Sequence, residues 1–111
     1  MYRNADSWIL HADVYGSEDK FDVFVEVPGI CLEDIELEVT PQTVRVWGIK
    51  KAPIQDATAL AIEIQTGDFF REIHLPGRVD TTEVFAELTA GTLHITLRSQ
   101  KPVRVSIPVQ S

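Results

Sequence analysis

The chain of 111 residues has little of several features that would point to a special compartment. It contains one cysteine, Cys31, so no intramolecular disulfide can form. No apolar run approaches the ~20 residues of a membrane-spanning helix, and no N-terminal run has the form of a signal peptide. These absences predict a cytoplasmic protein without a disulfide framework.

Basic residues are also few, because ten lysines and arginines stand against seventeen acidic residues and give a formal charge of −7. Such a charge disfavours nucleic acid or an anionic membrane as a partner. With 44% hydrophobic residues, the composition is typical of a folded chain rather than a disordered one. At this length we expect one domain with one modest core.

Residue patterns that could carry out covalent chemistry are missing as well. His11, His74 and His94 fall on separate predicted strands, without cysteines or paired carboxylates at metal-ligand spacing. Cys31 follows a Pro-Gly turn among acidic residues, whose charges disfavour the reactive thiolate. Phosphate-binding glycine loops, nucleophile elbows and Ser-His-Asp patterns do not occur. We therefore expect no catalytic, metal-binding or cofactor-binding residues, and no enzyme.

What the sequence does contain is a recurring alternation of apolar and polar residues, which is typical of half-buried β-strands. In residues 21–27, one face carries Phe21, Val23, Val25 and Val27. Further strand patterns, separated by turn residues, cover residues 35–39, 43–48, 69–75, 84–88 and 92–97. The sequence therefore predicts an all-β fold, an immunoglobulin-like antiparallel β-sandwich of about seven to nine strands.

Two connections between predicted strands carry specific expectations. Residues 49–61 have no clear period, and we interpret this region as a loop with a short strand near Ala59 to Ile64. A tight connection at residues 89–91 joins the last two strands. Because an alanine at positive φ costs about 1–2 kcal/mol, we expect Gly91 in the left-handed conformation and Ala90 in a right-handed one.

Arg71 shares parity with Phe69 and Ile73, so it points inward if its strand is regular. An inward guanidinium needs a compensating charge, because leaving it unpaired is strongly unfavourable. We expect an ion pair with Glu63, Asp68 or an acid of a second subunit. A ligand-binding role for Arg71 is the alternative.

Three blocks of sequence, in order, resemble the small heat shock proteins, the Hsp20 family with its α-crystallin domain. Residues 25–39, VEVPGICLEDIELEV, are similar to that family's strand, Pro-Gly turn and following strand. Residues 69–76, FFREIHLP, reproduce its F-x-R-x-x-x-L-P pattern, and residues 86–97, AELTAGTLHITL, its A-x-x-x-x-G-x-L-x-I-x-L signature. The resemblance divides the chain into a short N-terminal segment (1–10), an α-crystallin domain (11–100) and a C-terminal extension (101–111).

This resemblance implies an ATP-independent holding chaperone, which binds partly unfolded proteins, prevents their aggregation and assembles with itself. The family's groove for a tail or a client lies between two strands. The positions that match it here are Ile35, Leu37, Val39, Val84, Ala86 and Leu88. These positions would also suit a core, so full burial is the alternative.

The resemblance also implies a homodimer formed by strand exchange, in which a strand from the long loop of one subunit pairs with an early strand of the other. The residues expected at this dimer interface are Ala12, Val14, Tyr15, Ala59, Ala61, Ile62 and Arg71. A longer paralogue could join such an assembly.

Ile107-Pro108-Val109 resembles the family's I-x-I/V tail anchor. In an extended segment, residues two apart project to one side, so Ile107 and Val109 present paired apolar knobs to a neighbouring subunit. Packing of the tail on its own domain is the alternative.

The N-terminal segment is shorter than the long arm usual in the family, so we expect weaker holding activity and a dimer or small oligomer. Its apolar cluster is formed by Trp8, Ile9 and Leu10. This cluster either packs on its own sandwich or inserts into a partner's groove.

Two other classes of function remain open. A co-chaperone or adaptor of the related p23-like type has the same sandwich but binds a folded partner and stays monomeric. The tail anchor and residues 69–76 favour the holding chaperone. A carbohydrate- or ligand-binding sandwich lacks an aromatic platform, since Trp47 is the one ring expected to face outward from a strand.

Overall fold

The computed structural model describes residues 8–100 and 108–110, and within them it contains seven β-strands. The strands are β1 (Ala12–Gly16), β2 (Lys20–Glu26), β3 (Ile35–Val39), β4 (Thr43–Lys50), β5 (Gly67–His74), β6 (Val79–Thr89) and β7 (Thr92–Ser99). A short 3-10 turn, η1 (Leu32–Asp34), precedes β3. All strand pairs are antiparallel, which confirms the predicted all-β antiparallel sandwich.

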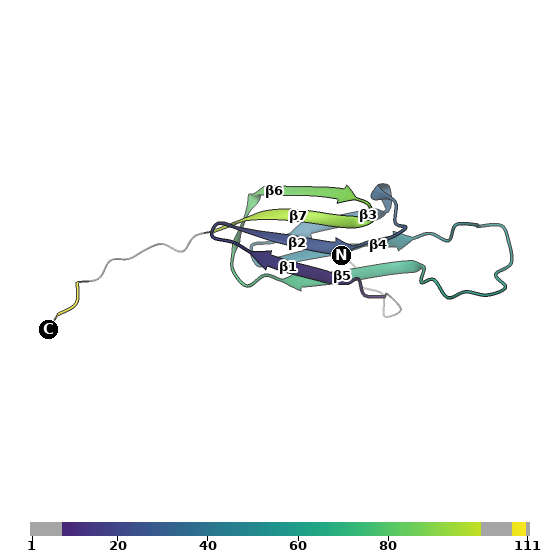
Figure 1. The fold of residues 1–111 in the computed structure, drawn as a ribbon, viewed down its shortest axis with the longest axis horizontal. Helices are drawn as coiled ribbons and strands as arrows, with labels where there is room; N and C mark the ends of the chain where they lie inside the picture. Colours follow the sequence, from purple (N-terminus) through teal and green to yellow (C-terminus); the bar gives the residue numbers. More distant parts are fainter. Residues whose placement is uncertain (1–7, 101–107, 111) are drawn as a thin grey trace.

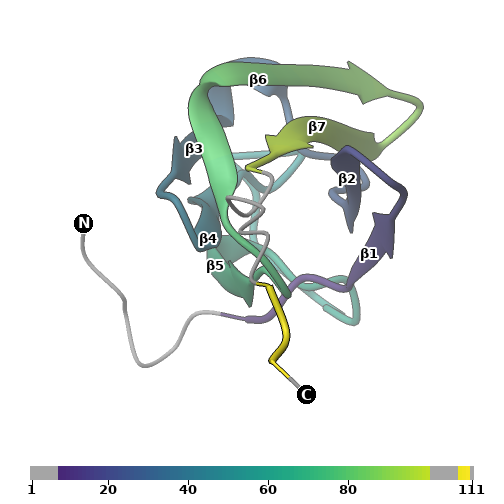
Figure 2. The same ribbon diagram turned by 90° about the vertical axis from the view of Figure 1, so that its left-hand side faces the viewer.

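The strands form a four-stranded sheet in the order β1-β2-β7-β6 and a three-stranded sheet in the order β3-β4-β5. The chain passes from one sheet to the other between β2 and β3 and again between β5 and β6 (Figure 1). Figure 2, which looks along the strands, shows the two layers and a sharp bend in β6. The first and last of the described strands, β1 and β7, therefore lie in the same sheet.

The core lies between the two sheets and is built from alternate residues of the strands. Side chains without exposed surface include Val23, Val25, Val44, Val46, Ile95 and Leu97. Burying a side chain of this size contributes about 1.5–3 kcal/mol. Successive strand residues point to opposite faces, so the sequence predicted that Val23, Val25 and Val27 point into the core. The structure confirms this, because all three side chains are fully buried.

A two-residue turn joins β6 to β7, with Thr89 paired to Thr92 across it. Both central residues have positive φ, 50° at Ala90 and 77° at Gly91. The expected right-handed conformation of Ala90 is therefore wrong. A turn with positive φ at both positions matches the twist of the flanking strands, and this match outweighs the local cost of about 1–2 kcal/mol at the alanine.

Gly48 in β4 allows η1 to pack closely on the sheet. Its φ is 155°, and a Cβ there would overlap the carbonyl oxygen of Asp34 and lie 2.9 Å from the ring of Phe69. A backbone oxygen cannot move aside as the end of a flexible side chain can. The position therefore requires glycine.

Each sheet ends in two outer strands, β1 and β6 in one sheet and β3 and β5 in the other. The edge of β5 is partly covered by Trp8, whose backbone N–H donates to the backbone carbonyl of Asp68 at 3.2 Å. The carbonyl of Trp8 accepts from the N–H of Phe70 at 3.3 Å. An outer strand is a template for pairing with another chain, so the surfaces of interest lie along these edges.

Candidate binding surfaces

The residues predicted to form the groove lie on β3 and β6, one outer strand from each sheet. Half-buried residues packed against the core are Ile35, Leu37, Val39, Val84 and Leu88, whereas Ala86 is exposed. Both strands lie near the same margin of the sandwich (Figure 2). Since an outer strand has a neighbour on one side alone, its inward side chains stay partly accessible. Full burial, the alternative left open by the sequence, does not occur.

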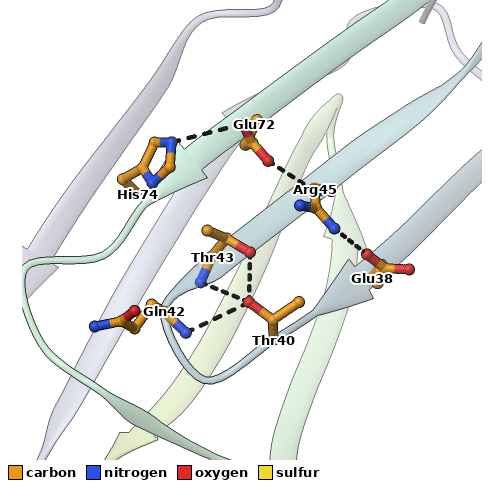
Figure 3. Close-up of polar contacts among 7 residues, drawn as sticks. All are labelled: Glu38, Thr40, Gln42, Thr43, Arg45, Glu72 and His74. Atoms are coloured by element: carbon orange, nitrogen blue, oxygen red, sulfur yellow. Dashed lines mark hydrogen bonds and ion pairs between the residues drawn. The ribbon is translucent and has the colours of Figure 1, made fainter. Parts of the chain in front are cut away.

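Arg45 of β4 ties the three-stranded sheet together on its outward face (Figure 3). Its Nη1 donates to Oε1 of Glu38 on β3 at 2.6 Å, and its Nε donates to Oε1 of Glu72 on β5 at 2.7 Å. Both hydrogen bonds raise the pKa of Arg45, and the bond to Glu72 has the larger effect. In the β3–β4 turn, the Thr40 hydroxyl oxygen accepts from the N–H of Thr43 at 3.0 Å. These hydrogen bonds hold β3 on the side that faces β4. They do not involve the opposite edge of β3.

The register of β6 to β7 shifts between Val79 and Val84, and β6 is sharply bent (Figure 2). Next to this shift, Oδ1 of Asp80 accepts from the hydroxyl of Thr82 at 2.6 Å and from its N–H at 2.9 Å. Both hydrogen bonds lower the pKa of Asp80, and the bond from the Thr82 hydroxyl has the larger effect. A bulge of this kind bends an outer strand and increases its twist. The part of β6 that carries the predicted groove residues begins directly after the register shift.

β1, the other outer strand of the four-stranded sheet, carries three of the residues predicted at the dimer interface. Ala12 is half-buried, Val14 is 37% exposed and Tyr15 is 59% exposed. Val14 lies opposite the buried Val23 and therefore has inward parity. An inward apolar side chain that is exposed leaves room for one more element beside β1.

The long loop between β4 and β5, residues 51–66, holds the predicted exchange residues Ala59, Ala61 and Ile62. Every residue of this loop is exposed, and none belongs to a strand. The short strand expected near Ala59 to Ile64 is therefore wrong for the single chain. An extended segment becomes a strand by pairing with a neighbour, and a lone chain supplies none here.

Leu60 and Ile64 are apolar residues within the segment near Ala59 to Ile64 that was expected to exchange, although the sequence did not single them out as interface residues. Leu60 is 94% exposed, and both Ile62 and Ile64 are 71% exposed. The three share one parity, so the alternation used elsewhere in the chain could have identified them. In an extended segment they would form one apolar face.

The base of the same loop encloses a hollow of about 730 Å³. Apolar loop residues, including Pro53, Ile62 and Ile64, line much of it. At its rim, Nζ of Lys51 lies 3.2 Å from Oδ1 of Asp34, and the hydrogen bond between them raises the pKa of Lys51. In the single chain, the loop extends away from the end of the sandwich (Figure 1).

Arg71 of β5 is half-buried, in keeping with its inward parity. Its Nη1 donates to the backbone carbonyl of Leu10 at 2.9 Å. The bond that the structure shows thus ends on a main-chain oxygen, where the sequence led us to expect a carboxylate of Glu63 or Asp68. Arg71 connects the segment before β1 to β5, a role with no signal in the local sequence.

Residues 8–10 pack on their own sandwich, which was one of the two alternatives. Leu10 is buried in the core, and the ring of Trp8 lies 6.0 Å from that of Phe69 between centroids. Nζ of Lys50 lies 5.9 Å from the centroid of the Trp8 ring. Nε1 of Trp8 is buried and has no hydrogen-bond partner in the described part of the chain. Ile9 between them is exposed.

The tail anchor is described in part. Ile107 lies outside the described residues, whereas Val109 is described and is 93% exposed. Residues 108–110 lie away from the sandwich (Figure 1). This end of the tail is therefore not packed on its own domain.

The histidines and the cysteine form no metal site in residues 8–100 and 108–110, where no group of three or more potential ligands occurs. Cys31 is exposed. His94 Nε2 lies 2.8 Å from Oδ1 of Asp22, and this hydrogen bond lowers the pKa of Asp22 against the opposing effect of partial burial. The same described residues contain no helix that is long and apolar enough to span a membrane.

The outward face of the four-stranded sheet carries more rings than the sequence led us to expect. Phe24 and His94 stack with ring centroids 4.3 Å apart and an interplanar angle of 13°. Tyr15 meets Phe24 edge-on at 5.8 Å, and Phe85 is 63% exposed on β6. The expectation that Trp47 is the one outward ring is therefore wrong. The alternation that turns the valines of β2 inward turns Phe24 outward, so the signal was present.

Comparison with known proteins now adds to this geometry. The family described as the Hsp20/alpha crystallin family matches residues 13–110. The heat shock protein HSP.16.4 of Streptococcus thermophilus is 25% identical over 115 residues, which cover 99% of this chain and 81% of that protein. The probable 15 kDa heat shock protein of Leptospira interrogans is 23% identical over 99 residues, which cover 89% of this chain and 76% of that one.

Solved structures show the same fold. Heat shock protein 16.0 from Schizosaccharomyces pombe matches with a TM-score of 0.75 at 23% identity, over 92% of this chain and 100% of its own. HSP18.5 from E. histolytica matches with a TM-score of 0.75 at 26% identity, over 91% of this chain and 100% of its own.

The family match runs from the second residue of β1 to residue 110 and so includes β2 to β7. Proteins of this family are ATP-independent chaperones rather than enzymes, which agrees with the expectation from the sequence. A chaperone role follows from the match, as do binding of client proteins and self-assembly. The chain belongs to the Hsp20/alpha crystallin family.

Proposed function

We propose that the protein is a holding chaperone that binds partly unfolded proteins, prevents their aggregation, and self-assembles by strand exchange and tail docking. The observation that carries this proposal is the accessibility of apolar residues along β3 and β6, the outer strands of the two sheets. An aggregating chain exposes apolar clusters and unpaired strand edges. Open edges and half-buried apolar rows can cap both through reversible contacts, without covalent chemistry.

Strand exchange to a homodimer is supported by two exposed surfaces that complement each other. One is the edge of β1, where Val14 has inward parity and is yet exposed. The other is the apolar row of Leu60, Ile62 and Ile64 in the loop of the partner. The loop is long enough, since ~12 extended residues reach ~40 Å. Pairing would satisfy the edge of β1 and cover both surfaces at once.

Tail docking is supported by the spacing of Ile107 and Val109 and by the exposure of Val109. In this proposal, the anchor inserts into the row formed by β3 and β6 of a neighbouring subunit. Proline between the two knobs lowers the entropy lost when the tail becomes ordered. Linked dimers then gain affinity from effective concentration.

We place the protein in the cytoplasm, since one cysteine provides no disulfide framework of the kind that small secreted domains use. Its partners in this proposal are further copies, non-native proteins and a longer paralogue. The charge of −7 supports the absence of nucleic acid and anionic membranes from this list.

The proposal is tested by heating a model client with the intact chain and with a variant lacking residues 101–111. The intact chain should suppress light scattering by the client, and the truncated variant should form a smaller assembly that is still a folded dimer. Static light scattering of the chaperone alone measures both sizes. A monomer at tens of micromolar, or a client that precipitates as if no chaperone were present, would contradict the proposal.

The anchor itself is separated from the rest of the tail by the double variant Ile107→Ala/Val109→Ala. It should reduce the size of the assembly as far as the full truncation does. The matched control, Val103→Ala/Val105→Ala, removes two apolar side chains from the same tail and should leave the size unchanged.

A further inference from the structure

The outward face of the four-stranded sheet carries a row of four side chains that crosses all four strands. Asp13 of β1 lies opposite Phe24 of β2, Phe24 opposite His94 of β7, and His94 opposite Glu87 of β6. The row thus places a stacked pair of rings between two carboxylates. Neither the groove of β3 and β6 nor the exchange loop includes these residues. We call this row the acid-ring row.

Carboxylates around the rings outnumber cations that could neutralise them. The two cations of this face, Lys20 and Arg98, lie opposite each other at one end. Nζ of Lys20 lies 3.8 Å from Oδ2 of Asp22, and Nη1 of Arg98 lies 3.4 Å from Oε2 of Glu83. Each cation is therefore already close to an acid of its own.

Three carboxylates on this face, those of Asp13, Glu26 and Glu87, make no ion pair within residues 8–100 and 108–110. The rings therefore lie in an acidic surrounding. The face is also hollowed on both sides of Phe24. A shallow hollow of about 620 Å³ is lined by Asp13, Tyr15, Phe24 and His94, with Lys20 and its ion-pair partner Asp22 completing the lining. A second hollow of about 120 Å³ is lined by Asp13, Phe24 and Glu26 among others.

An aromatic face bordered by carboxylates has the chemistry that recognises guanidinium groups. A guanidinium stacks on an aromatic ring and donates two parallel hydrogen bonds to a carboxylate. Neighbouring strands lie about 4.8 Å apart, so the row from Asp13 to Glu87 spans about 14 Å. An extended peptide covers about 13 Å in four residues, so two arginines four positions apart can reach both carboxylates.

A second copy of the sandwich does not fit this face, because the chain carries a net charge of −7 and would oppose carboxylate to carboxylate. An anionic ligand is disfavoured for the same reason. We infer that the acid-ring row binds arginine-bearing extended segments of non-native proteins, so that the chaperone favours basic clients. This inference rests on the proposed holding function and names a class of client for it.

The first test measures binding of labelled extended peptides by fluorescence anisotropy. The probe is a twelve-residue peptide with alternating apolar residues and two arginines four positions apart, and its control carries glutamates in place of the arginines. The intact chain should bind the arginine peptide more tightly than the glutamate peptide, which keeps the same apolar residues for the rows of β3 and β6. Binding should weaken as salt is added, because exposed charge pairs are screened.

The double variant Asp13→Asn/Glu87→Gln should weaken binding of the arginine peptide about tenfold. Phe24→Leu, which keeps an apolar side chain without a ring, should weaken it about threefold. The matched control Glu36→Gln/Asp56→Asn makes the same change in net charge at exposed positions outside the face and should bind as the intact chain does. Equal binding by the intact chain and Asp13→Asn/Glu87→Gln would overturn the inference.

The C-terminal extension is the competing occupant, because Lys101 and Arg104 are its two cations and it contains no acid. The variant Lys101→Gln/Arg104→Gln keeps Ile107 and Val109 and separates the two cases. Unchanged binding of the arginine peptide supports a client surface. A several-fold gain in affinity would mean that a tail occupies the row, and this result overturns the inference.

The second test compares heat aggregation of one basic and one acidic client. Asp13→Asn/Glu87→Gln should lose protection of the basic client and retain protection of the acidic one. Equal protection of both clients by this variant and by the intact chain would overturn the inference while leaving the proposed function standing. Failure of the intact chain to protect either client contradicts the proposed function, and the peptide assay still decides whether the row binds arginine.

Discussion

Single residues of this protein show how the cost of a local conformation is set by the elements around it. Ala90 has positive φ because the turn must match two twisted strands, although an alanine alone avoids this conformation. Gly48 answers a different demand, since a Cβ at its position would overlap a backbone carbonyl. The conformation of Ala90 therefore raises the free energy of the native state, whereas glycine at position 48 avoids a steric clash.

Replacing Ala90 by glycine or asparagine should therefore stabilise the fold by about 0.5–1 kcal/mol, because both residues adopt positive φ at lower cost. The free energy of unfolding in urea measures the gain. Ala57→Gly in the exposed loop is the matched control, since Ala57 does not have positive φ. A gain of the same size in the control would show that the turn is not its source.

The stability of the protein should depend on the protonation of Asp22, whose pKa the hydrogen bond from His94 lowers from its ordinary value of 3.8. A lowered native pKa adds stability above the ordinary value, and this stability is lost as pH falls through the lowered one. Asp22→Asn should cost less than about 1 kcal/mol near neutral pH, and the difference from the intact chain should shrink as the pH falls below 3.8 and through the lowered pKa. Urea unfolding across this range, with the exposed Asp56→Asn as control, measures the effect. A difference that persists at the lowest pH would refute this origin.

At the scale of elements, the segment before β1 acts as a cover for β5. Trp8 pairs its backbone with Asp68 and Phe70, and Arg71 donates to the carbonyl of Leu10. The segment thus covers the edge of one outer strand, whereas no other strand within residues 8–100 and 108–110 pairs with the outer edges of β1, β3 and β6. In the proposed function, these three edges are therefore the ones used for self-assembly and client binding.

The contribution of Trp8 should come from its ring and not from its indole N–H. Nε1 is buried without a partner in the described part of the chain, so Trp8→Phe removes a group that gains nothing from folding. We expect Trp8→Phe to cost less than about 1 kcal/mol and Trp8→Ala about 2–3 kcal/mol in urea unfolding. The neighbouring exposed Ile9→Ala is the control and should change stability by less than about 0.5 kcal/mol. Equal losses for the phenylalanine and alanine variants would contradict this account.

At the scale of the whole molecule, the single chain keeps a strong apolar surface in its long loop and an open edge at β1. Ile62 is 71% exposed and Ile54, in the same loop, is 63% exposed. In the proposed exchange, Ile62 becomes buried beside β1 of the partner, whereas Ile54 lies outside the exchanged segment.

Ile62→Asp should therefore raise the dissociation constant of the dimer at least about tenfold, because a carboxylate would be buried in the interface. The unfolding midpoint of the dissociated monomer should not change, since Ile62 is exposed there. Light scattering over a dilution series measures the constant. Ile54→Asp adds the same charge to the same loop and should leave the dimer intact. Equal dissociation by both variants would argue against exchange at residues 59–64.

The sequence by itself determined most of the strands, their inward parity and the resemblance to the family. These properties are local, because the alternation of apolar residues in 21–27 or 43–48 follows from the two-residue period of any strand. The three blocks that resemble small heat shock proteins are equally local. The lack of a period in residues 49–61 and the tight connection at residues 89–91 were also readable locally, although the strand expected near Ala59 to Ile64 and the right-handed Ala90 were wrong.

The tertiary structure alone decided which strands lie at the edges and which side chains meet across them. The partial exposure of Leu37 and Leu88 depends on β3 and β6 being outer strands, and the bond from Arg71 joins residues far apart in sequence. The acid-ring row exists because Asp13, Phe24, His94 and Glu87 share one register across four strands. Strand order and register depend on contacts between segments that are distant in sequence. The pattern of apolar and polar residues within one strand does not show which other strand it pairs with.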